Sequence, residues 1–290
     1  MTQILRRTCI MVGLAVALVM LVAGKPLLAN PVATAHVRAE LGSVVTAIQP
    51  GAAFWVVLHL TMQEGWHTYW QNPGDAGLAT TIRWVLPPGF TAGDIVWPYP
   101  QPLPVGPLMN YGYEGEVALL TRMTAPADLQ TAEPVTLQAK TTWVACADVC
   151  IPGSATLDVQ LPVRAAQPQA DARWTAVFEQ TQPTLPKPAP WQVVFSADPD
   201  TLTLLVKGSE VARTHLAEAT FFPSTYGIID HAAPQQVQIT HQGLRLTLQR
   251  GTFDIARLPH IEGVLVLQET QAGASHVQAF TIKAVPLKAS

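Results

Sequence analysis

The 290-residue sequence contains few charged residues, few basic residues and very little cysteine. Asp, Glu, Lys and Arg make up 13% of the chain, well below the roughly 25% of an average domain. The 17 Lys and Arg residues and the formal net charge of −3 argue against a nucleic-acid-binding protein, which requires a clustered basic surface. After residue 30 no apolar run reaches the roughly 20 residues that span a bilayer. We therefore expect no stable membrane insertion of the mature chain.

The first thirty residues have the organisation of a secretory signal peptide. Two arginines precede an apolar stretch, residues 9–24, and the segment Leu27-Leu-Ala29, which ends in a small residue, leads to a cleavage site. We expect export and a periplasmic mature chain, and the alternative is a retained membrane anchor. Cys9 would leave with the signal peptide, so Cys146 and Cys150 would be the two cysteines of the mature protein, in a compartment where disulfides form.

Proline is abundant, with 25 residues, and Val, Thr and Leu recur in short runs between Pro and Gly. This pattern predicts an all-β protein with strands bounded by proline. About seven strands are expected over residues 31–165, which fits an immunoglobulin-like sandwich. We predict a short helix and a Pro-rich linker at residues 166–190. Residues 191–290 are expected to form a second, smaller β-sandwich that serves as a docking or spacing module.

The two mature cysteines follow an alternating segment, Val135 to Trp143, that predicts a half-buried strand. Four extended residues span roughly 13 Å, but a disulfide requires Cα atoms within about 7 Å, so an oxidised pair requires a sharp turn. A bridge that closes so short a loop contributes only about 2 kcal/mol to stability. The spacing therefore suits a redox-active pair, a structural bridge or a two-thiolate metal site. Asp148 would either raise the pKa of the thiols or simply cap the turn.

An aromatic segment, residues 65–75, precedes the cysteines and ends in the turn signal Asn-Pro-Gly-Asp. Its His67 and Tyr69 are candidates for a wall beside the thiols, and the alternative is an aromatic core strand. A protonated His67 close to a thiolate would lower the pKa of that cysteine.

A second aromatic segment, residues 108–115, follows a stretch with five prolines in eleven residues, 97–107. That stretch cannot be a central strand. Glycines between the tyrosines of residues 108–115 predict a mobile loop, and the alternative is an ordinary β-connection with packed tyrosines. The candidate site residues of this segment are Met109, Asn110, Tyr111, Tyr113 and Glu114.

Three ordered motifs resemble the N-terminal periplasmic domain of the thiol:disulfide interchange protein DsbD, most closely its branch of suppressor-of-copper-sensitivity (ScsB) proteins. They are Gly65-Trp-His-Thr-Tyr-Trp-Gln-Asn-Pro-Gly-Asp75, Val105-Gly-Pro-Leu-Met-Asn-Tyr-Gly-Tyr-Glu-Gly-Glu116 and Trp143-Val-Ala-Cys-Ala-Asp-Val-Cys-Ile-Pro152. The resemblance covers residues 33–163 and is weaker beyond them. It implies that the first segment lies beside a redox-active cysteine pair and that the second is a cap loop over the disulfide.

The resemblance implies a thiol–disulfide exchange protein that needs no cofactor. Cys146 and Cys150 would pass reducing equivalents from a membrane-embedded thiol–disulfide donor to periplasmic thioredoxin-fold or other disulfide-bearing proteins. The sequence contains neither the membrane conduit nor the thioredoxin-like domain of DsbD, so we expect the donor to be a separate protein. Two other hypotheses are a periplasmic Cu(I)-binding protein, with Met109 or His67 near the thiolates, and a non-catalytic β-module with a structural disulfide.

Overall fold

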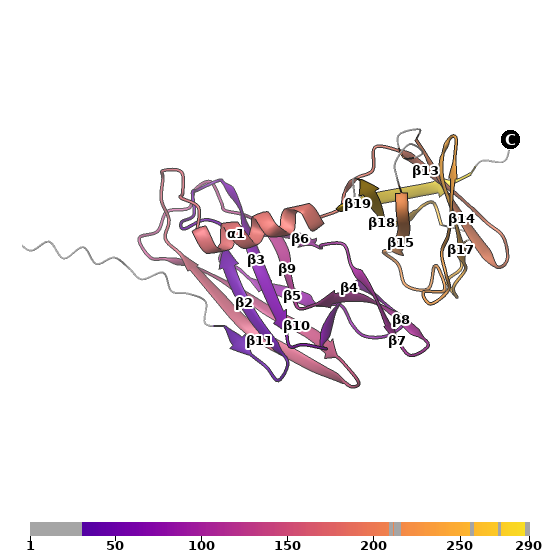
Figure 1. The fold of residues 1–290 in the computed structure, drawn as a ribbon. Coiled ribbons are helices and arrows are strands. Elements are labelled where there is room, and N and C mark those ends of the chain that lie inside the picture. Colours follow the sequence, from indigo (N-terminus) through magenta and orange to yellow (C-terminus); the bar gives the residue numbers. More distant parts are fainter. Residues whose placement is uncertain (1–30, 209–210, 212–215, 256–257, 272–273, 288–290) are drawn as a thin grey trace, which may run out of the picture.

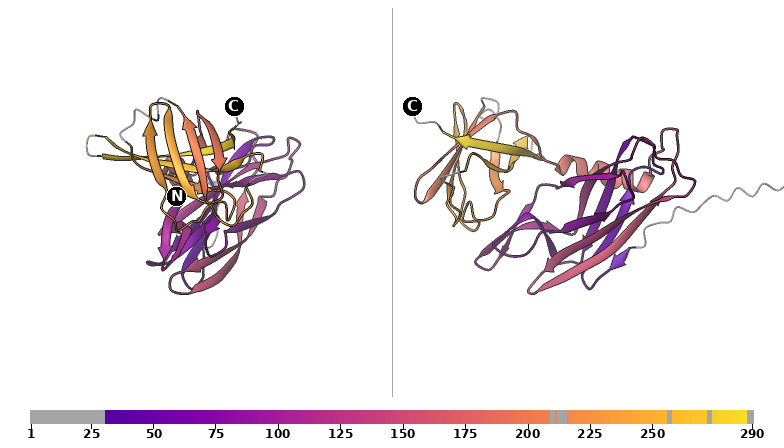
Figure 2. Two further views of the ribbon diagram at one scale, coloured as in Figure 1. Left: turned by 90° about the vertical axis from the view of Figure 1, so that its right-hand side faces the viewer. Right: turned by 180° about the vertical axis from the view of Figure 1, so that it is seen from behind.

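The structure, a computed structural model, describes residues 31–208, 211, 216–255, 258–271 and 274–287. The expected signal peptide lies outside these residues. Within them, strands dominate, and no helix is long and apolar enough to cross a membrane. Figures 1 and 2 show an elongated molecule with two β units joined along one side by a helix. The predicted all-β class is confirmed.

Eleven strands, which form two sheets, build the first unit. They are β1 (Val32–Ala33), β2 (Val37–Ser43), β3 (Ala53–Met62), β4 (His67–Gly74), β5 (Thr81–Val85), β6 (Thr91–Val96), β7 (Gln101–Val105), β8 (Leu108–Glu114), β9 (Glu116–Thr124), β10 (Val135–Cys146) and β11 (Cys150–Leu161). One sheet has the order β1-β2-β3-β9-β6. The other has the order β11-β10-β4-β8-β7, and β5 pairs with β10 outside this path.

The two sheets of the first unit enclose a common apolar core. Side chains along β10 alternate between buried and exposed, because successive residues of a strand face opposite sides. Leu58 and Leu119 of the first sheet belong to the same buried cluster as Leu137, Trp143 and Leu157 of the second. This arrangement confirms the predicted immunoglobulin-like sandwich.

The Pro-rich stretch contributes an edge strand, and the segment after it is also a strand. β7 lies at the edge of its sheet, where proline is tolerated because one side of the strand has no partner. Residues 108–114 form β8 between β7 and β4, so the mobile loop predicted from the glycines is wrong. A Cβ atom on Gly112 would lie 2.0 Å from the carbonyl oxygen of Thr68. This glycine therefore allows two strands to approach closely.

Helix α1 (Ala172–Thr181) connects the units and packs on the first of them. The side chain of Asp171 caps its N-terminus by accepting a hydrogen bond of 3.0 Å from the backbone N–H of Trp174. The Trp174 ring lies directly over Gly42 of β2, where a Cβ atom would meet it at 1.8 Å. A short 3₁₀ turn, η1 (Gln182–Thr184), ends the helix before the chain enters the second unit.

The second unit is a single sheet of eight strands around one core. The strands are β12 (Lys187–Pro188), β13 (Gln192–Ala197), β14 (Thr201–Lys207), β15 (Leu216–Pro223), β16 (Gln236–Thr240), β17 (Gly243–Gln249), β18 (Ile261–Gln271) and β19 (Ala274–Pro286). Their order is β15-β18-β19-β13-β14-β17-β16, with β12 on β19. The Pro-rich linker thus adds a short strand to this sheet, which is one continuous hydrogen-bonded surface.

The two units share an apolar contact. Phe222 of β15 is buried, and its ring centroid lies 4.9 Å from that of Tyr111 in β8 and 6.3 Å from that of Trp70 in β4. The side-chain amide of Asn72 donates a hydrogen bond of 2.7 Å to the carbonyl oxygen of Pro223. The Tyr111 hydroxyl lies 3.1 Å from Nδ1 of His231. This contact fixes the position of β4 and β8, the strands next to the cysteine hairpin.

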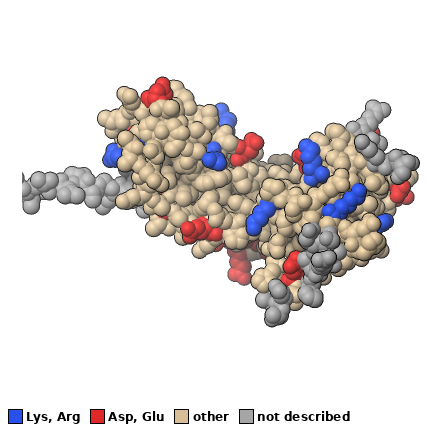
Figure 3. Space-filling model, turned by 90° about the horizontal axis from the view of Figure 1, so that it is seen from above, with Lys and Arg blue, Asp and Glu red and all other residues tan. Residues whose placement is uncertain are grey.

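Charged side chains are sparse on the surface, as the composition requires. On the face in Figure 3, Lys and Arg are scattered and interspersed with Asp and Glu, without a continuous patch of either sign. Contacts made by this face therefore depend mainly on apolar and hydrogen-bonding groups.

Candidate functional site

The two cysteines occupy the tip of the hairpin formed by β10 and β11. Cys146 is the last residue of β10, and Cys150, the first of β11, is its partner in the antiparallel register. A three-residue turn joins them, closed by a hydrogen bond of 3.1 Å from the Ala147 N–H to the Val149 carbonyl. The two Cα atoms lie 4.1 Å apart and the sulfurs form a disulfide. The sharp turn expected for an oxidised pair is thus achieved by strand pairing.

The two halves of the disulfide differ in accessibility. Cys146 is 2% exposed, whereas Cys150 lies on the surface. Val149 and Ile151, the neighbours of Cys150, are 61% and 37% exposed. An apolar surface therefore surrounds the accessible cysteine, which suits contact with another protein.

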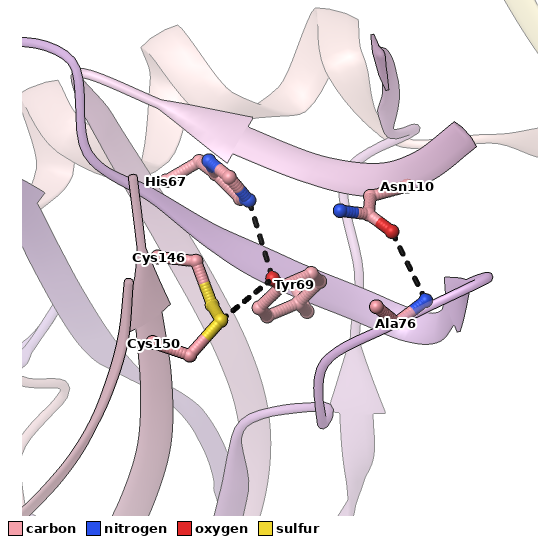
Figure 4. The surroundings of a disulfide bond; sticks show 6 residues. All are labelled: His67, Tyr69, Ala76, Asn110, Cys146 and Cys150. Carbon is pink, nitrogen blue, oxygen red and sulfur yellow. Dashed lines mark hydrogen bonds between the residues drawn. A yellow bond between two sulfur atoms is a disulfide. The ribbon is translucent and has the colours of Figure 1, made fainter. Parts of the chain in front are cut away.

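A histidine and a tyrosine from β4 lie next to the disulfide. The Tyr69 hydroxyl is 3.9 Å from Sγ of Cys150 and 3.3 Å from Nε2 of His67, as Figure 4 shows. The register also pairs His67 with Cys146, because β4 is the neighbour of β10. The alternation of β4 places His67 and Tyr69 on the same side of the strand. The side chains of His67, Tyr69 and Cys150 thus form a chain of two polar contacts that meet at the Tyr69 hydroxyl.

Burial determines the protonation states of His67 and Tyr69. It lowers the pKa of His67 below its ordinary 6.5, against an opposing effect of the Glu114 carboxylate, and raises the pKa of Tyr69 above 10.0. At neutral pH, His67 is therefore uncharged and Tyr69 keeps its hydroxyl proton. Tyr69 is then able to donate that proton in a hydrogen bond to a cysteine sulfur.

The chain after β4 covers the Tyr69 ring. Gly77 has a φ of +94°, and a Cβ atom on it would lie 2.2 Å from the ring. Two residues of β8 hold this segment. The Asn110 side-chain oxygen accepts a hydrogen bond of 3.0 Å from the Ala76 N–H (Figure 4). The Met109 N–H donates one of 2.8 Å to the Asp75 carboxylate, and the Met109 carbonyl accepts one of 3.0 Å from the Asp75 N–H. Strand β8 therefore reaches the disulfide surroundings through residues 75–77.

The other candidate residues lie farther from the sulfurs or on the surface. Tyr111 packs against the second unit, and the buried Tyr113 donates a hydrogen bond of 2.7 Å to the Pro98 carbonyl. Glu114 is exposed and pairs with His67 in the strand register. Asp148 is exposed in the hairpin turn. The structure thus brings His67 and Tyr69 to the disulfide directly, and Met109 and Asn110 through an intervening segment.

Sequence reasoning did not single out Gly77. The segments that contain Phe222 and His231, Phe221-Phe-Pro and Ile229-Asp-His, carry the weaker part of the resemblance, but the sequence assigned them no role in the site. The Asn-Pro-Gly-Asp signal indicated a turn after β4, but the sequence did not indicate that this turn would fold back over Tyr69. Phe222 and His231 reach the first unit through tertiary contacts with residues more than 100 positions away in sequence. Local patterning carries no information about such contacts.

No group of three or more His, Cys, Asp and Glu side chains in the described part of the chain is arranged to hold a metal ion. Both sulfurs are joined to each other, and the Tyr69 hydroxyl lies between Cys150 and the nearest imidazole. The geometry of the site is therefore that of a disulfide with a hydrogen-bonding neighbour.

The structure defines an immunoglobulin-like sandwich that carries a disulfide at the tip of one hairpin. Residues 38–162 match the family described as thiol:disulfide interchange protein DsbD, N-terminal. This match supports a thiol–disulfide interchange domain and confirms the resemblance found in the three motifs. No curated protein matches the chain.

The fold also matches a solved structure, the N-terminal periplasmic domain of ScsB from Proteus mirabilis. The TM-score is 0.61 at 18% sequence identity, over 88% of this chain and 97% of that one. The match includes the second unit, so both β units have a counterpart there. The fimbrial adhesin FimA from Actinomyces, at 11% identity over 86% of this chain and 97% of the other, has a TM-score of only 0.22 and supports no argument.

Proposed function

We propose that this protein passes reducing equivalents from a membrane-embedded thiol–disulfide donor to the disulfides of exported proteins, through Cys146 and Cys150. The observation that carries the proposal is the asymmetric disulfide at the tip of the hairpin, with one sulfur-bearing residue on the surface and the other buried. A purely structural bridge has no need of this asymmetry. The match of residues 38–162 to the DsbD N-terminal family supports the same chemistry.

Reduction of the Cys146–Cys150 disulfide begins when a thiolate of the donor attacks Sγ of Cys150. A mixed disulfide between the donor and Cys150 forms, and the Cys146–Cys150 bond breaks with Cys146 leaving as a thiolate that takes up a proton. The second thiolate of the donor then attacks the donor's own sulfur in the mixed disulfide. This releases the Cys150 thiolate and leaves the donor oxidised, after the transfer of two electrons to the cysteine pair and the uptake of one proton by Cys146.

Reduction of a target follows the same steps in reverse. The Cys150 thiolate attacks the target disulfide and one target sulfur leaves as a thiolate. Cys146 then loses its proton and attacks Cys150, which restores the internal disulfide and releases the second target sulfur. The register pairing of Cys146 with Cys150 supports this step, because it keeps the two residues opposite each other on paired strands.

Tyr69 and His67 act as positioning residues for this exchange. The Tyr69 hydroxyl, 3.9 Å from Sγ of Cys150, stabilises the thiolate by donating a hydrogen bond to it. His67, on the other side of that hydroxyl, orients it. A hydrogen bond to the charged form lowers the thiol pKa and increases the fraction of reactive thiolate.

The surrounding segments protect the pair from unintended partners. Residues 75–77 cover Tyr69, and β8 holds them through Asn110 and Met109, so we assign the capping role to this combination. Tyr111 and Tyr113 contribute by fixing β8 against Phe222 and Pro98. Glu114 influences the site through His67, and Asp148 lies exposed in the hairpin turn.

In this proposal each part of the chain has its own role. Residues 1–30 direct export to the periplasm, 31–165 carry out exchange, 166–190 connect the units, and 191–290 position the first unit and its partners. Partners are thiol–disulfide proteins: the membrane donor on one side and periplasmic thioredoxin-fold or other disulfide-bearing proteins on the other. The exposed apolar residues beside Cys150 support docking of such proteins.

A redox titration tests the proposal. The purified protein is equilibrated with defined ratios of reduced and oxidised dithiothreitol, and the fraction of disulfide is measured by mass spectrometry after alkylation. We expect a potential above about −300 mV, the range of reducible, catalytic disulfides. A potential well below this value, with no exchange with a thioredoxin-fold protein, would assign the bridge to stability and overturn the proposal.

A further inference from the structure

The sheet of the second unit has two edges, β15 and β16, that approach each other without pairing in the described part of the chain. They are linked by one side chain. The Gln235 amide accepts a hydrogen bond of 2.8 Å from the Phe221 N–H and donates one of 2.9 Å to the Phe221 carbonyl. In an antiparallel sheet, a residue on a neighbouring strand would form the same two hydrogen bonds with Phe221. Gln235 therefore takes the place that a peptide group of an intervening strand would occupy.

The backbone of β15 offers further hydrogen-bonding groups in the same direction. The N–H and C=O groups of Phe221 point away from its partner strand β18 and towards Gln235. Along a strand these directions repeat every second residue. The backbone groups of Ala219 therefore point into the same gap between β15 and β16.

The backbone of β16 faces the gap from the other side. Its hairpin with β17 closes at Thr240 and Gly243, with two residues in the turn. In such a hairpin the closing residues bond to each other, so residues at even positions bond to β17. The backbone groups of Val237 and Ile239 are consequently directed at the gap. Both edges thus present free donors and acceptors to the same space.

A cavity of about 510 Å³ occupies this space. Residues 216–220 and 231–235, together with Val237 and Ile239, line it. Pro102, Met109 and Tyr111 of the first unit form a further wall. The volume lies within the range of roughly 300–1,000 Å³ that is usual for binding sites. The groove therefore combines sufficient room with two unpaired sheet edges.

We propose that this groove binds an extended, largely apolar segment of another polypeptide, which adds as a strand between β15 and β16. The pairing directions along the sheet make β15 and β16 antiparallel, so the added strand runs antiparallel to one edge and parallel to the other. Strand addition of this kind obtains affinity from the backbone and selectivity from alternate side chains. The lining is mostly apolar, and Glu218 favours a basic residue at one exposed position of the segment.

The occupant comes from another molecule because the terminal strands of this chain are already paired. β1 pairs with β2 in the first unit, and β19 lies inside its sheet between β18 and β13. The proposal does not depend on the cysteines. A variant with both Cys146→Ser and Cys150→Ser substitutions should bind the segment as the unaltered protein does.

Amide hydrogen exchange tests this proposal. The probe is a pool of acetylated peptides of about seven residues, a usual strand length, with Val, Ile, Leu or Phe at alternate positions and Thr, Ser or Lys between them. At millimolar peptide we expect exchange of the Ala219, Val237 and Ile239 amides to slow by at least about tenfold, because they become hydrogen-bonded. Ala217→Trp, which fills the groove with an indole, should abolish this protection, and the matched Ala217→Ser control should retain it.

Three outcomes would overturn the proposal. The first is no protection at these amides in the presence of the peptides. The second is protection that persists unchanged in the Ala217→Trp variant. The third is the same protection without peptide in a protein that sediments as a dimer, which would assign the groove to a second copy of this chain. The variant with both Cys146→Ser and Cys150→Ser substitutions has no exchange chemistry, so the peptide protection measured in it reports on the groove alone.

Discussion

The three residues that separate Cys146 from Cys150 along the chain give the two ends of one bond different environments. Cys146 belongs to the buried end of β10, and Cys150 begins β11 on the surface, next to the Tyr69 hydroxyl. An incoming thiolate therefore reaches Cys150 first. The order of the chemical steps follows from this asymmetry, since the reactivity of a cysteine depends on access as well as on its pKa.

Substitution of Tyr69 with Phe should make the Cys150 thiol less acidic. Loss of the hydrogen bond to the Cys150 thiolate raises the pKa of this thiol by about one unit. The smaller fraction of thiolate then slows the reaction more than the higher nucleophilicity of each thiolate accelerates it. Attack of the reduced protein on oxidised glutathione should slow about threefold at neutral pH and show no deficit above the pKa of the variant. Stopped-flow rates across pH measure this. Tyr226→Phe, an exposed tyrosine of the second unit, is the control, and identical pH profiles for all three proteins would contradict the role of Tyr69.

The buried histidines should make the protein less stable in mild acid. Burial lowers the pKa of both His67 and His231 below the ordinary 6.5, so the unfolded chain binds more protons than the folded one between these values. The free energy of unfolding should therefore fall as the pH decreases from about 7 through 6.5, and level off once the pH is below the folded-state pKa values.

Urea denaturation at several pH values between about 7.5 and 5.5 tests the histidine effect. In this range most carboxylates remain ionised, so the histidines dominate the change. The double variant with His67→Gln and His231→Gln should be less stable at neutral pH but show a smaller pH dependence. An unchanged slope in that variant would assign the acid sensitivity to other groups.

At the scale of single elements, the turn after β4 determines how well the site is covered. Gly77 must adopt a positive φ and lies against the Tyr69 ring. Gly77→Ala should therefore destabilise the fold by about 1–3 kcal/mol and displace the segment, so that dithiothreitol reduces the disulfide faster. Chemical denaturation and reduction kinetics measure the two effects. Gly106→Ala is the matched control, because Gly106 also has a positive φ but has open space around it. Equal reduction rates for both variants would show that residues 75–77 do not shield the disulfide.

The elements differ in how far the sequence predicts them. The alternation of β10 and the separation of the cysteines required a strand followed by a sharp turn, and the hairpin meets that requirement. The segment 108–114 was expected to be a loop because of its glycines, but Gly112 is small so that β8 can pass close to Thr68. A glycine that provides flexibility and one that provides close approach look the same in the sequence. Only the identity of the neighbouring strand distinguishes them.

At the scale of the whole molecule, the contact between the units holds the strands that support the site. Phe222→Ala should destabilise the protein by about 3–5 kcal/mol, because it leaves a cavity among Trp70, Tyr111 and the second unit. Denaturant unfolding, followed by the fluorescence of tryptophans in both units, measures the loss. Val264→Ala, in the same cluster but with a smaller side chain, should cost less. A loss below about 1 kcal/mol for Phe222→Ala would contradict a tight contact between the units.

The sequence predicted the all-β class, the immunoglobulin-like first unit and the presence of a second β unit. These depend on strand patterning and proline placement, which are local properties. The sequence did not predict the contact of Tyr111 with Phe222 and His231, because it joins residues more than 100 positions apart. Of the candidate site, the cysteines, His67 and Tyr69 lie together, because the register of β4 with β10 brings their strands side by side.

The most direct test of exchange through Cys150 is the trapping of a mixed disulfide. Cys146→Ser and Cys150→Ser proteins are reduced and mixed with an excess of an oxidised thioredoxin-fold protein, and the adducts are mapped by mass spectrometry. The account predicts rapid accumulation of an adduct on Cys150 in Cys146→Ser, and formation at least about tenfold slower on the buried Cys146 in Cys150→Ser. Equal rates in both variants, or no adduct in either, would contradict the account.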